Sequence, residues 1–192
     1  GDIVQFMHSA LGDIRVKGVY TGFSPDMSSG ITFGLKLPTG DHKFRNFDRD
    51  TSIGTGSTDV LLGAYHVGHP GDNWSWFVNG EAQQSVLITP NYRPGSDVNV
   101  SIGGYFNGRR VRGVTIVPLA QVIGSQRWSD TGEDSDHPNT GYRRLVLSPG
   151  VEFDFSSWRL YADVGFPVYQ YVNGNQLVAT AFYKVVVGRS FR

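Results

Sequence analysis

The sequence contains no cysteine, so it can form no disulfide and can hold no metal through thiolates. It also lacks any run of about 18 apolar residues, which excludes a transmembrane helix. Charged residues make up only 18% of the chain, below the ~25% of ordinary soluble domains. Lysine plus arginine and aspartate plus glutamate number 17 each, so the basic excess typical of nucleic-acid-binding proteins is missing. We therefore expect no nucleic-acid partner.

Helical periodicity is absent from almost the whole chain, whereas alternation of apolar and polar residues is common. In residues 158–168 every second residue is apolar, and an arginine and an aspartate lie on the opposite face. No linker or shift in composition divides residues 1–192, so we predict a single all-β domain. We predict about nine strands, at residues 11–23, 30–37, 57–68, 74–87, 97–107, 110–126, 142–155, 158–170 and 177–191.

Some positions interrupt this alternation. Both faces of residues 110–126 are apolar in the middle, and we expect a bulge near Gly113 to change the face. Because proline cannot donate to a strand ladder, Pro118 and Pro149 are also expected at bulges, and Pro167 near a strand end.

The connections between the predicted strands alternate in length. "SPDMSS", "HPGDN", "NGR" and "SS" are short, whereas residues 38–56, 88–96 and 128–141 form longer polar loops and "YVNGNQ" is intermediate. Short turns at one end and long loops at the other are typical of antiparallel up-and-down barrels in the bacterial outer membrane. We therefore predict an up-and-down transmembrane β-barrel.

The composition of the two faces indicates which one meets lipid. The polar face is rich in glycine, serine, tyrosine and asparagine and poor in charge, unlike a surface washed by water. Aromatic residues gather at strand ends, where membrane barrels carry interfacial girdles: Trp74, Trp76, Phe155, Trp158, Tyr169, Tyr171 and Phe191. We expect the apolar face to contact the lipid bilayer. A soluble lipocalin-like ligand-binding barrel, with its apolar face inside, is the alternative.

Four motifs in order along the chain resemble a known family. They are "LKLPTGD" at 35–41, "GTGSTDVLLG" at 54–63, "LSPGV" at 147–151 and "GFPVYQ" at 165–170. They are similar to the outer-membrane transporter family named after the meta pathway of phenol degradation. The resemblance implies an outer-membrane barrel associated with the degradation of aromatic compounds. The sequence departs from the family in ending on Arg192 after Phe191, and in lacking strands before the segment "ALGDIRVKGVY".

Counting strands leads to an expectation about the natural protein. If the last strand descends to the periplasm, the first predicted strand descends too, whereas single-chain bacterial barrels have an even number of strands. We expect an odd number of strands before Gly1, giving a barrel of ten to twelve, unless residues 1–10 supply a short ascending strand themselves.

Charged residues on the polar face are the candidate functional residues. They line either a conduit whose charges tune selectivity or a paired network that plugs a narrow barrel. The function predicted first is a channel or transporter for small hydrophobic or aromatic solutes. The alternative is a closed structural or scaffold barrel that acts through its loops on other envelope proteins. The candidates are Arg15, Lys17, Lys36, Asp59, Glu81, Glu152, Asp154, Arg159, Asp163 and Lys184.

Other chemistry has little support in the sequence. The acidic loop with Asp130, Glu133, Asp134 and Asp136 could hold calcium, but its spacing differs from an EF-hand and a solvated loop is the simpler interpretation. No serine, histidine and acid stand in a catalytic order, and we predict neither an enzyme nor a cofactor.

One hairpin allows a sharp prediction of register. If Ser156 and Ser157 form a two-residue turn, Asp154 lies opposite Arg159 and Phe155 opposite Trp158. The same register places Glu152 opposite Tyr161 and Gly150 opposite Asp163.

Overall fold

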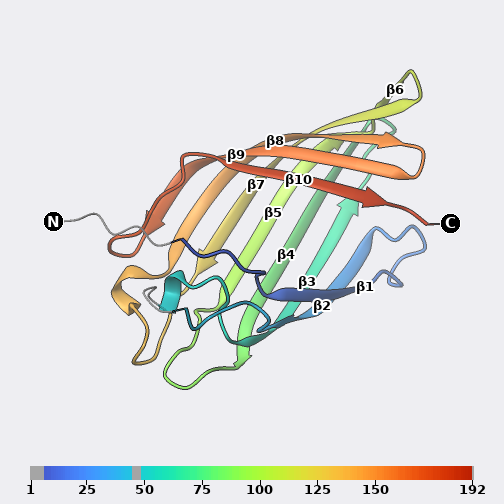
Figure 1. The fold of residues 1–192 in the computed structure, drawn as a ribbon. Coiled ribbons are helices and arrows are strands. Elements are labelled where there is room, and N and C mark those ends of the chain that lie inside the picture. The colour runs from blue at the N-terminus through green and yellow to red at the C-terminus, as the bar shows by residue number, and fades with distance from the viewer. Residues whose placement is uncertain (1–6, 45–48, 192) are drawn as a thin grey trace.

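The computed structural model describes residues 7–44 and 49–191, which form one antiparallel β-sheet curved into a half-barrel (Figure 1). Nine strands follow one another in the order β1-β2-β3-β4-β5-β7-β8-β9-β10, and the short β6 pairs with β7. The expected up-and-down order of an all-β chain is therefore confirmed. The strands are β1 (Ile14–Tyr20), β2 (Ser29–Leu37), β3 (Thr58–Gly68), β4 (Trp74–Leu87), β5 (Asp97–Phe106), β6 (Arg109–Val111), β7 (Val114–Arg127), β8 (Tyr142–Phe155), β9 (Trp158–Val172) and β10 (Phe182–Arg189).

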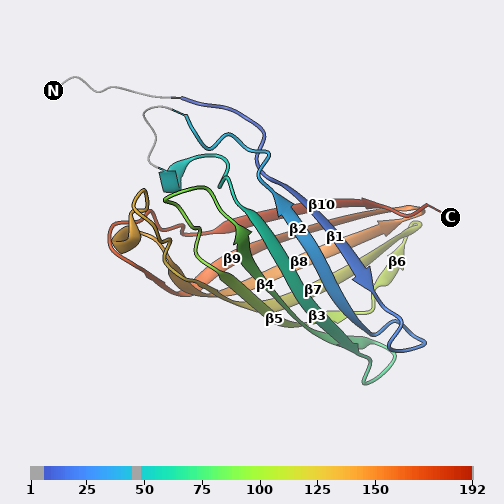
Figure 2. The same ribbon diagram turned by 90° about the horizontal axis from the view of Figure 1, so that it is seen from below.

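The half-barrel is open along one side. Strands β1 and β10 stand at the two ends of the strand order, and the described residues contain no pairing between them. Figure 2 shows the curved sheet from below, with the concave face enclosed by the strands. The expectation of further strands before Gly1 stays a prediction.

The two ends of the sheet differ in their connections. Residues 38–44, 49–57, 88–96, 128–141 and 173–181 lie in the loops of one end, which includes the short 3₁₀ helices Arg49–Thr51 and His137–Asn139. Residues 21–28, 69–73 and the turns at 112–113 and 156–157 form the other end (Figure 1). Within the described residues, no helix is both long and apolar enough to span a membrane.

The apolar side chains of the sheet face outward. Ile31, Phe33 and Leu35 of β2 are 43%, 53% and 46% exposed, and Val185 and Val187 of β10 are 69% and 63% exposed. Apart from glycines and Pro94, the buried residues of the described part of the chain are mostly polar: Lys36, Ser57, Asp59, Ser75, Ser85, Ser101, Asp130, Thr140, Ser148 and Asp163, against Leu61, Tyr92 and Val146. The described sheet thus has its apolar surface outside and its polar surface on the concave side.

The expectation of one strand at 110–126 with a bulge near Gly113 is wrong. Arg112 and Gly113 both have positive φ values, +49° and +88°, and form a tight turn between β6 and β7. The segment "NGR" is not a turn, because β5 and β6 both pair antiparallel with β7, with a one-residue shift in register between them. Asn107 donates its backbone N–H to Asn73 and its side-chain amide to Asp72, so the neighbouring β3–β4 turn holds it in place.

The prolines differ in their local structure. Pro118 lies where β7 changes its pairing from β5 to β6 with a shift in register, as expected of a bulge. No bulge accompanies Pro149, because the β8–β9 register is the same on both sides of it and only the pairing of residues 148 and 149 with β9 lapses. The bulge of β9 follows Pro167, where the extra residue is Val168.

This bulge corrects the alternation expected for residues 158–170. Leu145 pairs with Tyr169 and Val146 with Pro167, so Val168 is left without a partner. Beyond the bulge the two faces exchange, and Tyr169 is exposed on the outer face beside the apolar residues. Tyr169 therefore lies outside, whereas regular alternation continued from residues 158–168 would place it on the polar face.

The predicted register of the Ser156–Ser157 hairpin is confirmed. Phe155 pairs with Trp158 and Asp154 with Arg159, and the further pairs Glu152–Tyr161 and Gly150–Asp163 follow. Nε of Arg159 donates to Asp154 at 2.9 Å. Both side chains therefore lie on the same face, as expected.

Candidate functional site on the concave face

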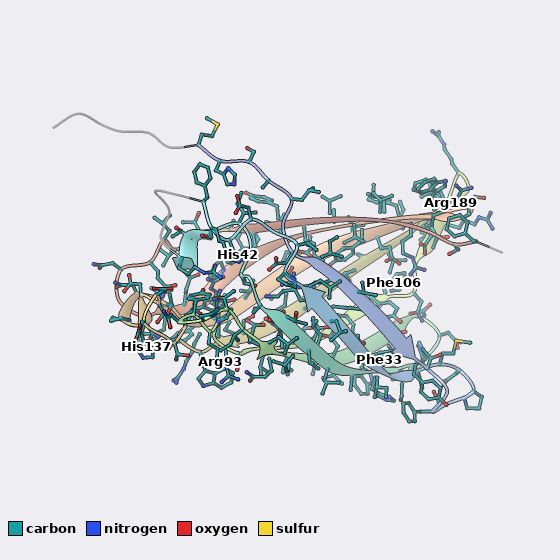
Figure 3. The ribbon with its side chains drawn as sticks, turned by 60° about the horizontal axis from the view of Figure 1, so that its bottom comes forward. Phe33, His42, Arg93, Phe106, His137 and Arg189 are labelled. Atoms are coloured by element: carbon teal, nitrogen blue, oxygen red, sulfur yellow. The ribbon has the colours of Figure 1, made fainter. Side chains whose placement is uncertain are left out.

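The ten predicted charged residues lie on seven of the strands and form four groups along the concave face. The first group lies next to the long loops, the second and third lie on opposite sides of the middle of the face, and the fourth lies next to the short turns. In Figure 3, His42, Arg93 and His137 mark the long-loop end of the molecule, and Phe33, Phe106 and Arg189 lie towards the short-turn end.

The first group centres on Lys36, whose side chain is 2% exposed. Its Nζ lies 2.8 Å from Asp59 and 3.5 Å from Asp13, and it donates to Ser57. Arg15, on the neighbouring strand, lies 3.5 Å from Gln83 and lines the same cavity of about 500 Å³. The Lys36 ammonium is thus buried and held by two carboxylates and by hydroxyls. We interpret it as a structural group, because its removal would leave buried carboxylates without an opposite charge.

Asp13 joins this group from the segment before β1. Burial would raise the pKa of its carboxyl, but hydrogen bonds from Thr55 and Gly40 and the charge of Lys36 outweigh burial and lower the pKa below its ordinary value. The ionised carboxylate of Asp13 thus connects the segment before β1 to the loop at 38–57.

The second group is the pair of Lys17 and Glu81, which join β1 to β4 across two intervening strands. Lys17 Nζ lies 2.7 and 2.6 Å from the two carboxylate oxygens. Glycine makes this possible, because a Cβ at Gly34 would lie 3.0 Å from Lys17 Cγ and one at Gly63 would lie 3.4 Å from Glu81 Cβ. The concave surface of β2 and β3 is therefore low enough for the two long side chains to meet.

The fourth group is at the short-turn end, where Arg159 lies 2.9 Å from Asp154 and 3.3 Å from Glu152. These three residues share a cavity of about 540 Å³ with aromatic and aliphatic side chains. The other side chains lining it include Tyr65, Phe77, Tyr105, Val117 and Leu119. The wall can accommodate an apolar or aromatic solute while the charges remain paired.

The third group lies in the middle of the face, where Asp163 and Lys184 are cross-strand partners. Asp163 is 8% exposed and accepts a hydrogen bond from the Tyr161 hydroxyl, to which Gln121 donates. Lys184 Nζ lies 5.6 Å from the centroid of the Tyr161 ring. Among the described residues, no ion pair within 4.0 Å joins Asp163 to Lys184.

Several residues of this face were not among the sequence candidates. Arg144 and Ser148 line a cavity of about 390 Å³ together with Asp163 and Lys184. Arg127 and Tyr142 line the cavity next to the long loops. Arg144 and Ser148 alternate along β8 with Gly150 and Glu152, and this alternation indicates that they share the polar face. Arg127 and Tyr142 lie at strand ends, where too few residues alternate to indicate a face.

The acidic loop is organised by one buried carboxylate. Asp130 is fully buried and accepts hydrogen bonds from the Tyr92 hydroxyl, the Gly95 amide and Arg127. Burial and the charge of Asp130 together raise the pKa of Tyr92 above its ordinary value. Asp136 accepts hydrogen bonds from Asn139 instead.

The calcium interpretation of this loop has no support in this geometry. Asp130, one of its four candidate ligands, is occupied by protein donors, and the other three candidates are Glu133, Asp134 and Asp136. Within residues 7–44 and 49–191, no three or more histidine, cysteine or acidic side chains are grouped so that they could hold a metal ion. The loop network instead joins the loops 88–96 and 128–141.

Two serine–histidine pairs occur, without a carboxylate partner for either histidine among the described contacts. Ser29 lies 2.8 Å from His66, and Ser75 lies 2.7 Å from His69. The Ser75 hydroxyl donates to Asn107, so it joins neighbouring turns.

A scan against models of known protein families gives no match, and neither do comparisons with curated proteins and with solved structures. The resemblance to the phenol-degradation transporter family therefore stays a prediction from the four sequence motifs.

Proposed function

We propose that this chain forms the wall of a β-barrel in the bacterial outer membrane that passes small hydrophobic or aromatic solutes. The observation that carries the proposal is the distribution of side chains. Valine, leucine, isoleucine and aromatic residues are exposed along the outer face of the sheet, while charged and hydroxyl side chains are buried on the concave face. A bilayer would cover the first surface, and a polar lumen would solvate the second.

The soluble lipocalin-like alternative requires the opposite arrangement. Such a barrel buries its apolar face around the ligand and presents polar residues to water. Here an outer face in water would expose a continuous apolar surface, which soluble monomers rarely do. The side-chain distribution favours the membrane alternative.

The free edges of β1 and β10 place a condition on the proposal. Backbone N–H and C=O groups that meet lipid must be hydrogen-bonded within the protein, because the hydrocarbon offers no partner. In the membrane, both edges must therefore be covered by strand pairing. Pairing between the edges, additional strands or a second chain would all meet this condition.

The scaffold alternative is favoured by the ion pairs. Lys17–Glu81, Lys36–Asp59 and Arg159–Asp154 all neutralise charge across the concave face, as a plugged barrel would require. The conduit is favoured by the cavities that the charged residues of the concave face help to line. These cavities measure about 390 to 540 Å³ and have partly apolar walls.

The first experiment tests membrane insertion. The purified chain is refolded with lipid vesicles, and its migration in detergent gels is compared with and without heating. Heat-modifiable migration and protection of the sheet from protease are expected. Quantitative recovery of a soluble, monodisperse protein without detergent would contradict the proposal.

The second experiment separates the conduit from the scaffold. Conductance steps of the inserted protein in a planar lipid bilayer are expected of a conduit. An inserted, heat-modifiable protein without conductance or solute flux would favour the scaffold.

A further inference from the structure

We propose that the cavity in the middle of the concave face binds a small monocarboxylate with an apolar or aromatic body. This inference rests on the proposed function and specifies its solute. The cavity measures about 390 Å³, near the lower end of the ~300–1,000 Å³ usual for small-molecule sites. Its lining residues come from β4, β5, β7, β8, β9 and β10.

The cations of this cavity differ from most other cations of the concave face, with the exception of Arg15, which donates to Gln83 at 3.5 Å. Lys17, Lys36, Arg127 and Arg159 each have a carboxylate oxygen within 2.9 Å. Arg144 and Lys184 have no ion pair and donate no side-chain hydrogen bond to any described residue. Two positive charges in one cavity, on β8 and β10, are thus available to an anion.

Aromatic rings hold the Arg144 guanidinium in place. Its Cζ lies 3.6 Å from the centroid of the Tyr142 ring and 5.3 Å from that of Phe182. Stacking on a ring leaves the planar edge of the guanidinium open, and that edge matches the two oxygens of a carboxylate. Arginine fixed in this way is a preorganised carboxylate site.

Unpartnered polar atoms in the wall give a second, independent observation. Ser148 is fully buried, lines the cavity and has a hydroxyl without a hydrogen-bond partner, and Arg144 Nε is also buried without one. Buried polar atoms are normally hydrogen-bonded, because an unmade bond costs about 1–3 kcal/mol. A carboxylate seated between Arg144 and Ser148 would supply the missing acceptor.

The charge balance selects a monoanion. The cavity lining contains two cations, Arg144 and Lys184, and one acid, Asp163, which leaves one positive charge uncompensated. A single carboxylate neutralises this charge, whereas a dianion would add repulsion from Asp163. Ile123, Val146 and Phe182 provide the apolar part of the wall, so the body of the solute should be apolar.

Binding of benzoate and of its neutral analogue benzyl alcohol to the full chain in detergent micelles tests the inference. Benzoate should bind at least tenfold more tightly than benzyl alcohol and than the dianion phthalate. Arg144→Gln should weaken benzoate binding at least tenfold and leave benzyl alcohol binding unchanged. Equal affinities for benzoate and benzyl alcohol would overturn the inference.

Arg143→Gln is the matched control, because Arg143 directly precedes Arg144 in β8 and is exposed on the outer face of the sheet. It should leave both affinities unchanged, and an equal loss with Arg143→Gln and Arg144→Gln would contradict a specific site. Ser148→Ala and Lys184→Gln test the site even if Arg144→Gln fails to fold, and each should weaken benzoate binding about fivefold. Unchanged benzoate binding in both would also overturn the inference.

The outcome is distinguishable from failure of the proposed function. Heat-modifiable migration is measured on every preparation used for binding. A chain that inserts and migrates as expected but does not prefer benzoate would refute only the carboxylate site. A chain that prefers benzoate but never inserts would refute the membrane function and keep the site.

Discussion

Individual charges on the concave face differ in how much they stabilise the protein. Lys36 and Asp59 are each 2% exposed on their side chains, whereas Lys17 and Glu81 are 38% and 33% exposed. Removing one partner of a buried pair leaves the other charge uncompensated, but an accessible pair is screened by water. The sequence places all four residues on one face, but it cannot rank them, because burial depends on the loop at 38–57 that covers only the first pair.

Lys36→Met is therefore expected to destabilise the folded chain by about 3–5 kcal/mol. Lys17→Met, the matched control, should cost no more than about 1 kcal/mol because its partner stays accessible to water. Chemical unfolding of both variants in lipid vesicles measures the difference. Equal costs would show that burial of Lys36 is energetically unimportant.

Acid should loosen the segment before β1 through Asp13. The folded pKa of its carboxyl lies below its ordinary value of 3.8, so its contribution to stability is fully present above that value. The contribution is lost as the pH falls through the lower, folded pKa. We expect protease cleavage at residues 38–57 to accelerate below about pH 4, and Asp13→Asn to show rapid cleavage already at neutral pH. An unchanged pH profile in Asp13→Asn would assign the acid sensitivity to another group.

At the scale of the elements, alternation predicts most strands and turn chemistry decides where it fails. The residue pairs of the Ser156–Ser157 hairpin follow from a two-residue turn, and the structure has them. Asn107-Gly108 is a stronger turn signal than Arg112-Gly113, so the sequence predicts the turn at residues 107–109 and a single strand over 110–126. The hydrogen bonds from Asn107 to the β3–β4 turn, which no local pattern indicates, move the turn to Arg112 and Gly113.

The Arg112–Gly113 turn gives a prediction with opposite signs at adjacent positions. Both residues have positive φ, which glycine and asparagine tolerate better than other residues. Gly113→Ala should destabilise the protein by about 1–2 kcal/mol, and Arg112→Asn should stabilise it by up to about 1 kcal/mol. Chemical unfolding in vesicles measures both, and a stabilising Gly113→Ala would rule out this turn.

At the scale of the whole molecule, the half-barrel could be anticipated only in part. Alternation and loop lengths predict an antiparallel up-and-down sheet, since both are local properties of the sequence. The Lys17–Glu81 contact across β2 and β3 depends on curvature and on small residues at Gly34 and Gly63, which alternation does not encode. Alternation along β8 places Arg144 on the concave face beside Tyr142, but it gives no sign of the contact with Phe182 on β10.

The outer face gives the sharpest test of the membrane proposal. Val185 is 69% exposed on this face, and Val185→Arg should cost about 2–4 kcal/mol if it lies near the bilayer midplane. Leu177→Arg is the matched control, because Leu177 is 99% exposed in the loop 173–181 and should tolerate arginine. Unfolding in lipid vesicles compares the two, and a harmless Val185→Arg would place the outer face in water.

The bulge at Val168 makes the length of β9 a determinant of which residues face inward. Strand geometry has a period of two, so the single extra residue inverts the parity of every position beyond it. A regular strand that kept Val168 in the ladder would turn Tyr169 and Tyr171 inward and Gln170 outward, whereas deleting Val168 would leave all three on their present faces, because Tyr169 would then follow Pro167 in regular alternation. The aromatic side chains at this rim are thus positioned by a residue count rather than by their own chemistry.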